Sequence, residues 1–343
     1  MKRIVVRRPG GYERLELVEE AAPEPGPGEV RVAARACGVN YADAIVRMGH
    51  YAAAKGRYPI TPGFEFAGEV EALGPGAARF KTGERVLGIT RFGGYASRIV
   101  VPEQQLWPCP AAWDFAECAA LPAVFLTAYH ALHRLAKVEL GERLLVHSAA
   151  GGVGTALLQL ARVAGCRSVA VVGSASKAEL CRSLGAEAVI DRSTQDLWAE
   201  ADRLAPDGFD VVLDANGVTT PRPGFERLRP EGRLIVYGFA EILPRGAGDP
   251  SLLRLAANYL RVPRFSPFEM TAANRSVLGF NVVFLFHRLD LADRAMQDVL
   301  RWIAEGKIGK VPVTPFPFER AADAHRAIES GNTTGKLALT IQD

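Results

Sequence analysis

The stretch from Leu144 to Gly154, L-L-V-H-S-A-A-G-G-V-G, has the residue types and the spacing of a phosphate-binding turn. An apolar run leads into a group of glycines, and apolar residues then recur at three- and four-residue spacing, which predicts a strand, a tight turn and a helix. In a dinucleotide fold, Gly151 would let the backbone approach a pyrophosphate and Gly154 would let the helix pack on the strand. The helix N-terminus would then offer N–H groups to the phosphates.

Ala149 replaces the first glycine of the usual G-x-G-x-x-G pattern, so a strand-helix turn without a ligand is the alternative interpretation. We interpret the turn as a dinucleotide site. The cofactor-binding residues that this predicts are Ala150, Gly151, Gly152, Val153 and Gly154.

The next predicted strand, Val169 to Val172, ends about twenty residues after the turn, where an NAD enzyme carries Asp or Glu for the ribose 2′-hydroxyl. Gly173 stands there instead and removes a carboxylate that would repel a 2′-phosphate. Ser174 and Lys177 follow and supply a hydroxyl and a cation. The sequence therefore favours NADPH bound near these three residues, and a polar loop with a solvated lysine is the alternative.

Length and composition indicate how many domains position these residues and which classes of partner lack support. At roughly 100 to 200 residues per domain, 343 residues predict two domains. A formal charge of +3 without a dense basic run gives no support to nucleic-acid or membrane-surface partners. The longest apolar run, Val277 to Phe286, is interrupted by Asn281 and is too short to span a bilayer.

The five cysteines are scattered and form no C-x-x-C pair, and no signal peptide is recognisable at the N-terminus. We therefore expect reduced thiols and a cytoplasmic protein. The six histidines are dispersed as well. His130 and His133 share one predicted helix face without a third ligand nearby, which favours packing over metal binding.

The order of predicted elements indicates an α/β protein. Short alternating runs with glycine and proline make residues 1 to 123 mostly β. Phe115 to Leu135 is predicted to be helical, and strands then alternate with helices, as in a doubly wound parallel sheet. A helix at Leu291 to Glu305 and a strand at Leu337 to Ile341 are predicted to return to the first domain.

Six motifs in order carry a resemblance that covers almost the whole chain: P-x-P-G-P-G-E-V, C-G-V-N-Y-A-D, T-P-G-F-E-F-A-G, L-P-A-V-F-L-T-A-Y, A-A-G-G-V-G and L-G-F-N-V-V-F-L-F. The sequence resembles the zinc-free quinone oxidoreductases of the medium-chain dehydrogenase/reductase superfamily, in their vesicle amine transport protein-like branch. The resemblance implies a GroES-like, mostly β catalytic domain at residues 1–123, a Rossmann domain with a doubly wound parallel sheet at 124–284, and a return to the catalytic domain at 285–343. It also implies NADPH, a homodimer joined through the edges of the Rossmann sheets, and reduction of quinones, alkenals or enones.

The resemblance also implies catalytic residues. Asn40 and Tyr41 would border the nicotinamide, with Thr127 packed near it as a cofactor contact. Tyr51 would face the substrate cleft as a hydrogen-bond donor, although an aromatic residue at the rim of a loop is the alternative. Many family members carry an aromatic residue where this chain has Ile45, so a shared site with two tyrosines is in doubt.

On the nucleotide side, the resemblance assigns cofactor contacts to Asn216, to Gly238–Phe239 and to Phe284–Leu285–Phe286, which would close over the nicotinamide. Lys336 matches a family lysine near the 2′-phosphate. Arg192 stands where family members often have tyrosine; it could stack on adenine, pair with the 2′-phosphate or be a solvated charge.

The departures from zinc-bearing relatives bear on the reaction. Those relatives have cysteine at Asn40, histidine at Phe64 and four cysteines in the lobe where Leu87 to Tyr95 has none. A phenylalanine cannot ligate zinc, so we expect no metal. Hydride transfer to a quinone or an enone needs little polarisation of the acceptor and fits such a site. A protein that holds NADPH without turnover is the alternative function.

Overall fold

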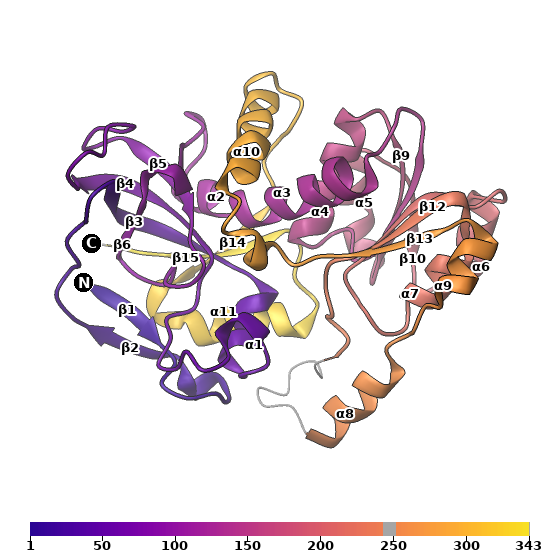
Figure 1. Cartoon of the computed structure of the whole chain (residues 1–343), viewed down its shortest axis with the longest axis horizontal. Helices are drawn as coiled ribbons and strands as arrows, with labels where there is room; N and C mark the ends of the chain where they lie inside the picture. The colour runs from indigo at the N-terminus through magenta and orange to yellow at the C-terminus, as the bar shows by residue number, and fades with distance from the viewer. Residues whose placement is uncertain (243–251, 343) are drawn as a thin grey trace.

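The computed structural model describes residues 1–242 and 252–342, and its two main sheets lie side by side (Figure 1). One is a six-stranded parallel sheet with the order β10-β9-β8-β11-β12-β13. The order reverses between β8 and β11, which is where ligands bind in doubly wound sheets. The strands are β8 (Arg143–Val146), β9 (Arg167–Val172), β10 (Ala186–Asp191), β11 (Phe209–Asp214), β12 (Leu228–Val236) and β13 (Ser276–Gly279).

Helices cover both faces of this sheet, which explains why its central strands are buried and mainly apolar. Every residue of β11 is buried. The connecting helices are α4 (Gly152–Val163), α5 (Ala178–Ser183), α6 (Leu197–Leu204) and α7 (Pro221–Glu226), and α8 (Leu252–Arg261) and α9 (Pro267–Ala273) precede β13. The predicted doubly wound parallel sheet is therefore confirmed.

The other sheet is mainly antiparallel and has the order β14-β15-β3-β4-β5-β7, with β6 also paired to β3. Its strands are β3 (Glu29–Val39), β4 (Glu65–Leu73), β5 (Arg85–Ile89), β6 (Arg98–Pro102), β7 (Leu106–Pro108), β14 (Val313–Pro317) and β15 (Lys336–Thr340), and a separate hairpin pairs β1 (Lys2–Val5) with β2 (Glu16–Glu19). Because β15 pairs with β3, the end of the chain lies in the N-terminal sheet. Both termini consequently lie on the same side of the molecule (Figure 1).

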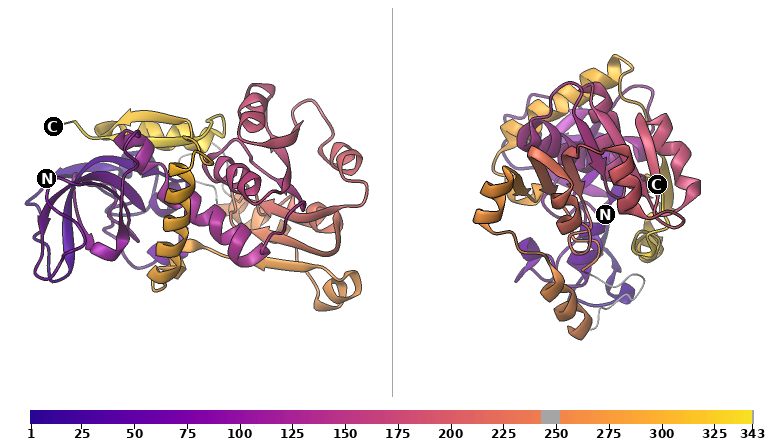
Figure 2. Two further views of the ribbon diagram at one scale, coloured as in Figure 1. Left: turned by 90° about the horizontal axis from the view of Figure 1, so that it is seen from above. Right: turned by 90° about the vertical axis from the view of Figure 1, so that its right-hand side faces the viewer.

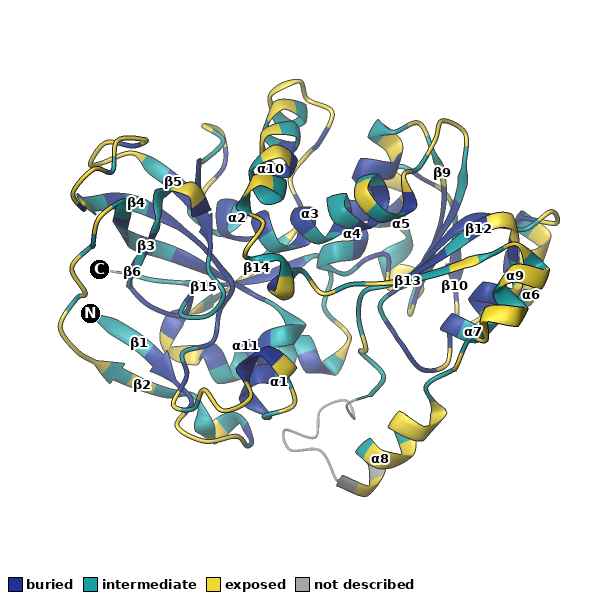
Figure 3. Ribbon diagram, viewed as in Figure 1, coloured by how far each residue is buried: buried dark blue, intermediate teal, exposed yellow. Residues whose placement is uncertain are grey.

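Two helical segments join the sheets. The first contains α2 (Phe115–Ala119), α3 (Pro122–Tyr129) and a π-helical continuation, His130–Ala136. The second, α10 (Leu289–Ala304), crosses the junction (Figure 2), where its Asp293 accepts hydrogen bonds from Trp107 at 2.9 Å and Arg79 at 3.1 Å. One cluster of buried hydrophobic residues extends from one sheet through α3 to the other, and Figure 3 colours the buried segments dark blue.

By length and composition, residues 115–136 are the one helical stretch of the described chain that could cross a membrane. Its apolar window is 61% buried between the two sheets, so the interior of the fold accounts for its composition. The structure also corrects the prediction of one helix over Phe115 to Leu135. Proline at position 122 lacks an N–H and begins a new helix, so α2 ends at Ala119.

Other boundaries shift because tertiary pairing extends strands beyond their local pattern. Strand β3, for example, continues to Val39, where it pairs with Leu337. Several helices were not predicted: α1 (Tyr41–Arg47), α7, α8, α9 and α11 (Ala321–Ser330). The domain limits at 123/124 and 284/285 stay predictions.

Candidate active site

A cavity of about 880 Å³ opens at the carboxyl ends of β8, β9 and β11, where the strand order reverses. It brings together many residues that the sequence singles out: Asn40, Tyr41, Ala150, Gly151, Gly152, Val153, Gly173, Ser174, Lys177, Arg192, Asn216 and Lys336. Its walls come from both sheets, since the segment from Ile328 to Leu337 closes one side. The cavity is large enough for an extended organic ligand.

The glycine turn has the geometry that its sequence predicts. A Cβ atom built on Gly154 would lie 2.5 Å from the Ser148 carbonyl oxygen and 2.6 Å from the backbone of Ala149, so only glycine lets α4 pack on β8. A Cβ built on Gly151 would lie 3.3 Å from the Ser148 oxygen, a tight contact, and would meet no other non-neighbouring atom of the described residues within 4 Å. The packing role predicted for Gly154 is therefore confirmed. Gly335 donates a hydrogen bond to the Ala150 oxygen at 2.7 Å and ties the C-terminal segment to the turn.

Positive charge gathers where β9 ends. Arg192 Nε lies 3.9 Å from the position that a Cβ of Gly173 would occupy, and the guanidinium has no hydrogen-bond or ion-pair partner among the described residues. Lys177 Nζ donates to the Gly331 oxygen at 3.0 Å across the cavity mouth. Ser174 and Ser176 share a hydrogen bond at 3.0 Å. Hydroxyls and cations thus surround the place where the sequence predicts a 2′-phosphate.

Several residues of this wall were missed by the sequence reasoning. They are Ser176, Ser193, Gly331, Asn332 and Thr333. The serines could have been found, since one belongs to the G-S-A-S-K loop and the other follows Arg192. The segment 331–333 joins the wall only because β15 returns to β3, and no local pattern announces that return.

Lys336 is a correction. The resemblance implied a lysine near the 2′-phosphate, but the ammonium group is buried in an ion pair with Glu65 at 2.6 Å. It also donates to the Val39 oxygen at 2.9 Å and to Asn40 Oδ1. All three N–H donors of the ammonium are therefore used at the junction of β3 and α1. A lysine neutralised in this way is not available to a phosphate.

Asn40 is the N-cap residue of α1, and hydrogen bonds fix both its backbone and its side chain. Its backbone N–H donates to Asp43 Oδ2 at 2.8 Å, and its Nδ2 donates to Glu65 Oε1 at 2.9 Å. Tyr41, the next residue, reaches the loop after β12, where its hydroxyl lies 3.3 Å from the Ala240 oxygen. The two predicted nicotinamide neighbours thus both line the cavity.

Asp43, three residues after Asn40, is a buried anchor. Its carboxylate accepts hydrogen bonds from Asn40 N–H, Gly63 N–H at 2.9 Å and the Tyr95 hydroxyl at 3.1 Å. Burial raises the pKa of Asp43 to about 7, against the lowering effect of these donors. The network continues from Tyr95 to His325 Nε2 at 3.2 Å, and His325 Nδ1 lies 3.3 Å from Arg47.

We predict that His325 makes stability depend on pH. Burial, followed by the charge of Arg47, lowers the pKa of His325 to about 3 from a usual 6.5. The unfolded chain binds a proton below pH 6.5 that the folded chain does not, so this stability is complete above 6.5 and is lost as pH falls. The difference in unfolding free energy between wild type and His325→Gln should shrink by about 1.4 kcal/mol per pH unit.

Urea unfolding of both proteins at several pH values between about 7 and about 5 measures this difference. Asp43 titrates in the same range and is linked to His325 through Tyr95, so the comparison is repeated with Asp43→Asn in both proteins, which removes that titration. Stability curves that run parallel across this range would contradict the assignment.

Tyr51 lies in an aromatic cluster that we call the Tyr51–Phe64–Phe92 cluster. The ring centroid of Tyr51 is 5.7 Å from that of Phe64 and 6.5 Å from that of Phe92. The Tyr51 hydroxyl donates to Asn281 Oδ1 at 3.1 Å. Burial raises the pKa of Tyr51 to about 12, so the hydroxyl stays protonated at neutral pH. Phe64, at the position of a zinc-ligating histidine in the metal-bearing relatives, gives this region an apolar wall.

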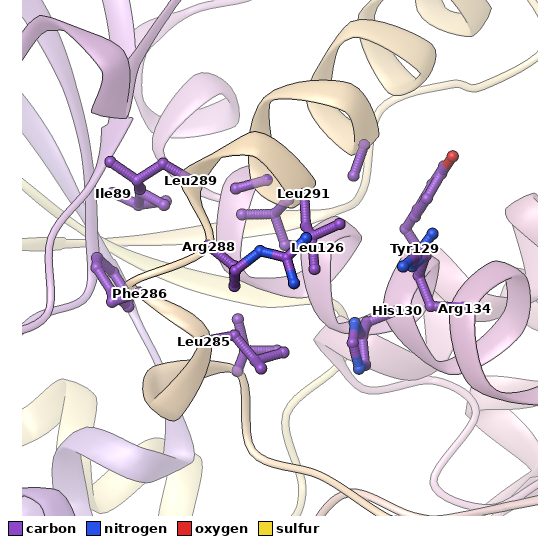
Figure 4. A pocket seen from close by; sticks show the side chains of 13 residues that line it. Ile89, Leu126, Tyr129, His130, Arg134, Leu285, Phe286, Arg288, Leu289 and Leu291 are labelled. Carbon is purple, nitrogen blue, oxygen red and sulfur yellow. The ribbon is translucent and has the colours of Figure 1, made fainter.

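Other predicted contacts do not line the cavity. Thr127 bonds the backbone of its own helix, at 2.7 Å from the Ala123 oxygen. Gly238 and Phe239 pack behind the Ala215–Gly217 turn, so they support the wall without forming it. Phe284 is 51% exposed, and Leu285 and Phe286 line a separate small apolar pocket between α3 and α10 (Figure 4). The expectation that Phe284–Phe286 closes over this cavity is thus not met.

The histidine and cysteine predictions can be compared with the structure as well. His130 packs against Phe280 with ring centroids 4.7 Å apart, and His133 lies between Tyr129 and Trp302. Both are packed residues, as favoured. All five cysteines are free thiols. Within residues 1–242 and 252–342, no group of three or more His, Cys, Asp or Glu side chains could hold a metal, and the absence of zinc stays a prediction.

Comparison with known proteins agrees with this geometry. Residues 26–111 match the alcohol dehydrogenase GroES-like domain family, and residues 184–339 match the zinc-binding dehydrogenase family. The chain is 35% identical over 332 residues to the synaptic vesicle membrane protein VAT-1 homolog of Rattus norvegicus, which covers 96% of this chain and 81% of that protein.

Solved structures are similar over the whole length. Escherichia coli quinone oxidoreductase complexed with NADPH has a TM-score of 0.86 and 27% identity, covering 99% of this chain and 100% of that one. The CurK enoyl reductase has a TM-score of 0.85 and 26% identity, covering 99% of each chain. This chain therefore belongs to the medium-chain dehydrogenase/reductase superfamily of oxidoreductases, in the family that holds the VAT-1 homologues and the quinone oxidoreductases.

Proposed function

We propose that this protein is an NADPH-dependent, zinc-independent reductase that transfers hydride to a quinone or to an α,β-unsaturated carbonyl such as an alkenal or enone. One observation carries the proposal: a single cavity is lined by the cations Lys177 and Arg192 from one sheet's edge and by the amide of Asn40 from the other sheet's side. The related quinone oxidoreductase of known structure binds NADPH, and another relative is an enoyl reductase, which agrees with this reaction class.

The residues present fit NADPH. Gly151 leaves room for a pyrophosphate beside the N-terminus of α4, whose N–H groups favour anions. Glu329 is the one acidic side chain among the described residues that line the cavity, and it is paired with Arg47 at 2.8 Å. Ser174, Lys177 and Arg192 would hold the 2′-phosphate. When bound, NADPH supplies the hydride.

The chain's own groups would act on the acceptor. The β-carbon of an enone accepts the hydride, its π electrons move onto the carbonyl oxygen, and a proton from solvent completes the saturated product. The Tyr51–Phe64–Phe92 cluster does not line the cavity, and the one O–H of Tyr51 is donated to Asn281 Oδ1. We propose that the acceptor extends to this cluster and that the neutral Tyr51 hydroxyl exchanges Asn281 for the oxygen that gains charge. Oxidation of a simple alcohol requires removal of its hydroxyl proton. In the metal-bearing relatives, zinc lowers the pKa of that hydroxyl group.

NADPH consumption against a panel of quinones, alkenals and enones tests the proposal. We expect turnover with at least one of these classes and little NADP⁺-dependent oxidation of ethanol or benzyl alcohol. Robust alcohol oxidation without any quinone or enone reduction would contradict it. Binding of NADPH with no turnover on any acceptor would favour the alternative, a protein that holds the cofactor without catalysis.

Cofactor preference provides a second test. We predict that Lys177→Ala raises the KM for NADPH at least tenfold and leaves that for NADH nearly unchanged. A charge-assisted bond to the 2′-phosphate contributes roughly 1.5 to 3 kcal/mol, whereas the 2′-hydroxyl of NADH gives Lys177 little to bind. Initial rates with both cofactors measure the effect.

Lys307→Ala is the matched control, since Lys307 pairs with Glu305 at 2.7 Å and does not line the cavity. Equal losses for NADPH and NADH in Lys177→Ala would overturn the assignment.

We further propose a cytoplasmic homodimer, for which β13, the edge strand of the parallel sheet, would supply the joining surface.

A further inference from the structure

Beneath the cavity, a buried ion pair fixes the side-chain amide of Asn40, beside the predicted nicotinamide end. Lys336 and Glu65 are 3% and 0% exposed, and both contact Asn40. We propose that Glu65 and Lys336 are positioning residues, which turn the second amide N–H of Asn40 toward the carbonyl oxygen of the acceptor. This inference rests on the proposed function and adds the device that would polarise the acceptor.

The contacts determine the orientation of the Asn40 amide. Lys336 carries only donors, so the atom that it meets must be the amide oxygen, Oδ1. Glu65 Oε1 accepts from Nδ2 at 2.9 Å, which uses one of the two N–H bonds of that nitrogen. A flipped amide would place an oxygen against a carboxylate and N–H groups against an ammonium, which is unfavourable at both contacts.

The second N–H of Asn40 has no partner among the described residues, and Asn40 lines the cavity. In zinc-bearing relatives, the same position carries a metal-ligating cysteine. An oriented amide donor at this position can bind the oxygen of an acceptor carbonyl without a metal. A donor fixed before the reaction stabilises the developing charge without having to reorient.

The ion pair itself is held rigidly. Glu65 Oε2 accepts the backbone N–H of Ala123 at 2.7 Å, at the N-terminus of α3, where a negative charge is favoured. Gly38 makes room for this carboxylate, because a Cβ there would lie 2.4 Å from Glu65 Oε1 and 2.5 Å from the Ala119 oxygen. Lys336 passes below the glycine turn, with its Cδ 3.2 Å from the Cβ position of Gly152.

The experiment compares two acceptors, because an oriented donor matters more to one than to the other. Hydride addition to an enone makes an enolate with localised charge on oxygen, whereas addition to p-benzoquinone makes an aromatic hydroquinone anion. We expect Asn40→Ala to lower kcat about a hundredfold on an enone, in the range of removing one such donor, and less than about tenfold on the quinone. Lys336→Met/Glu65→Leu should change the ratio of the two rates in the same direction.

Arg233→Met/Glu142→Leu is the matched control, since it removes a largely buried pair with contacts of 2.8 Å that does not line the cavity. It should leave the ratio unchanged. Glu65→Gln, which keeps the shape of the side chain, replaces the double variant if that variant does not fold. Equal losses on both acceptors in the Asn40 and Glu65 variants would overturn the inference, because a general structural defect lowers both rates alike. Wild type inactive on both acceptors would instead reject the proposed function and this inference with it.

Discussion

Tyr51→Phe should lower kcat for enone reduction by about a hundredfold or more while the KM for NADPH stays nearly unchanged. The hydroxyl is protonated at neutral pH, since burial raises its pKa to about 12, and in the proposed complex it turns from Asn281 Oδ1 to the acceptor oxygen. A positioned donor to the oxygen that gains charge contributes in this range. The phenylalanine ring keeps the contacts with Phe64 and Phe92, so the loss reports on the hydroxyl. Steady-state rates at saturating NADPH measure the effect.

Tyr58→Phe is a suitable control for this prediction. Tyr58 packs against the same hydrophobic cluster, but its hydroxyl donates to the backbone oxygen of Val46. Its loss should affect stability and leave kcat close to that of wild type. If Tyr51→Phe retained full turnover, Tyr51 would be an aromatic residue at the rim, and polarisation of the acceptor would depend on other donors such as Asn40.

Much of the nucleotide-binding half could be predicted because its signals are local. Gly151 and Gly154 stand within a single turn, and their different surroundings follow from one strand-helix junction. Gly173 and Lys177 follow the next strand, so the parallel order alone brings them to the same edge of the sheet. Uninterrupted apolar runs and short connections then limit the topology to a doubly wound sheet.

The placement of Lys336 could not be predicted in this way. Its ammonium meets Glu65 and Asn40, which lie on other elements far away in the sequence, and only the pairing of β15 with β3 brings them together. The resemblance supplied a lysine at this position, but the neighbours of a lysine decide whether it binds a phosphate or a carboxylate. No local sequence pattern predicts the buried Lys336–Glu65 pair or the cavity wall formed by residues 331–333.

The aromatic region illustrates a different limit. Phe64 in place of a metal ligand could be interpreted from the sequence, because side-chain chemistry alone excludes it as a ligand. Its contacts with Tyr51 and Phe92 depend on how three loops fold over one another. Phe284 and Leu285 were wrongly expected at the large cavity for the same reason. They lie in a short helical turn after β13, and the sequence pattern of so short a turn does not predict where its side chains pack.

Gly154→Ala should weaken NADPH binding about a hundredfold and lower the unfolding free energy by about 1 to 3 kcal/mol. The added Cβ would lie 2.5 Å from the Ser148 oxygen and 2.6 Å from Ala149, and these are backbone atoms that cannot move aside as a side chain could. Relief of this overlap has to shift α4 away from the turn, at the usual cost of overpacking. The N–H groups that would bind the pyrophosphate move with the helix, and displacement by about 1 Å is enough for a loss of this size.

Gly309→Ala controls for the general cost of replacing a glycine, because a Cβ at Gly309 meets only Gln159 Oε1, at an ordinary contact distance of 3.9 Å. It should bind NADPH as wild type does and unfold at a similar urea concentration. Fluorescence titration with NADPH and urea unfolding, both applied to the two variants, separate the effects. Because the overlap at Gly154 is with backbone, loss of stability and loss of binding should occur together. A Gly154→Ala protein with wild-type affinity would show that the helix N-terminus does not hold the cofactor phosphates.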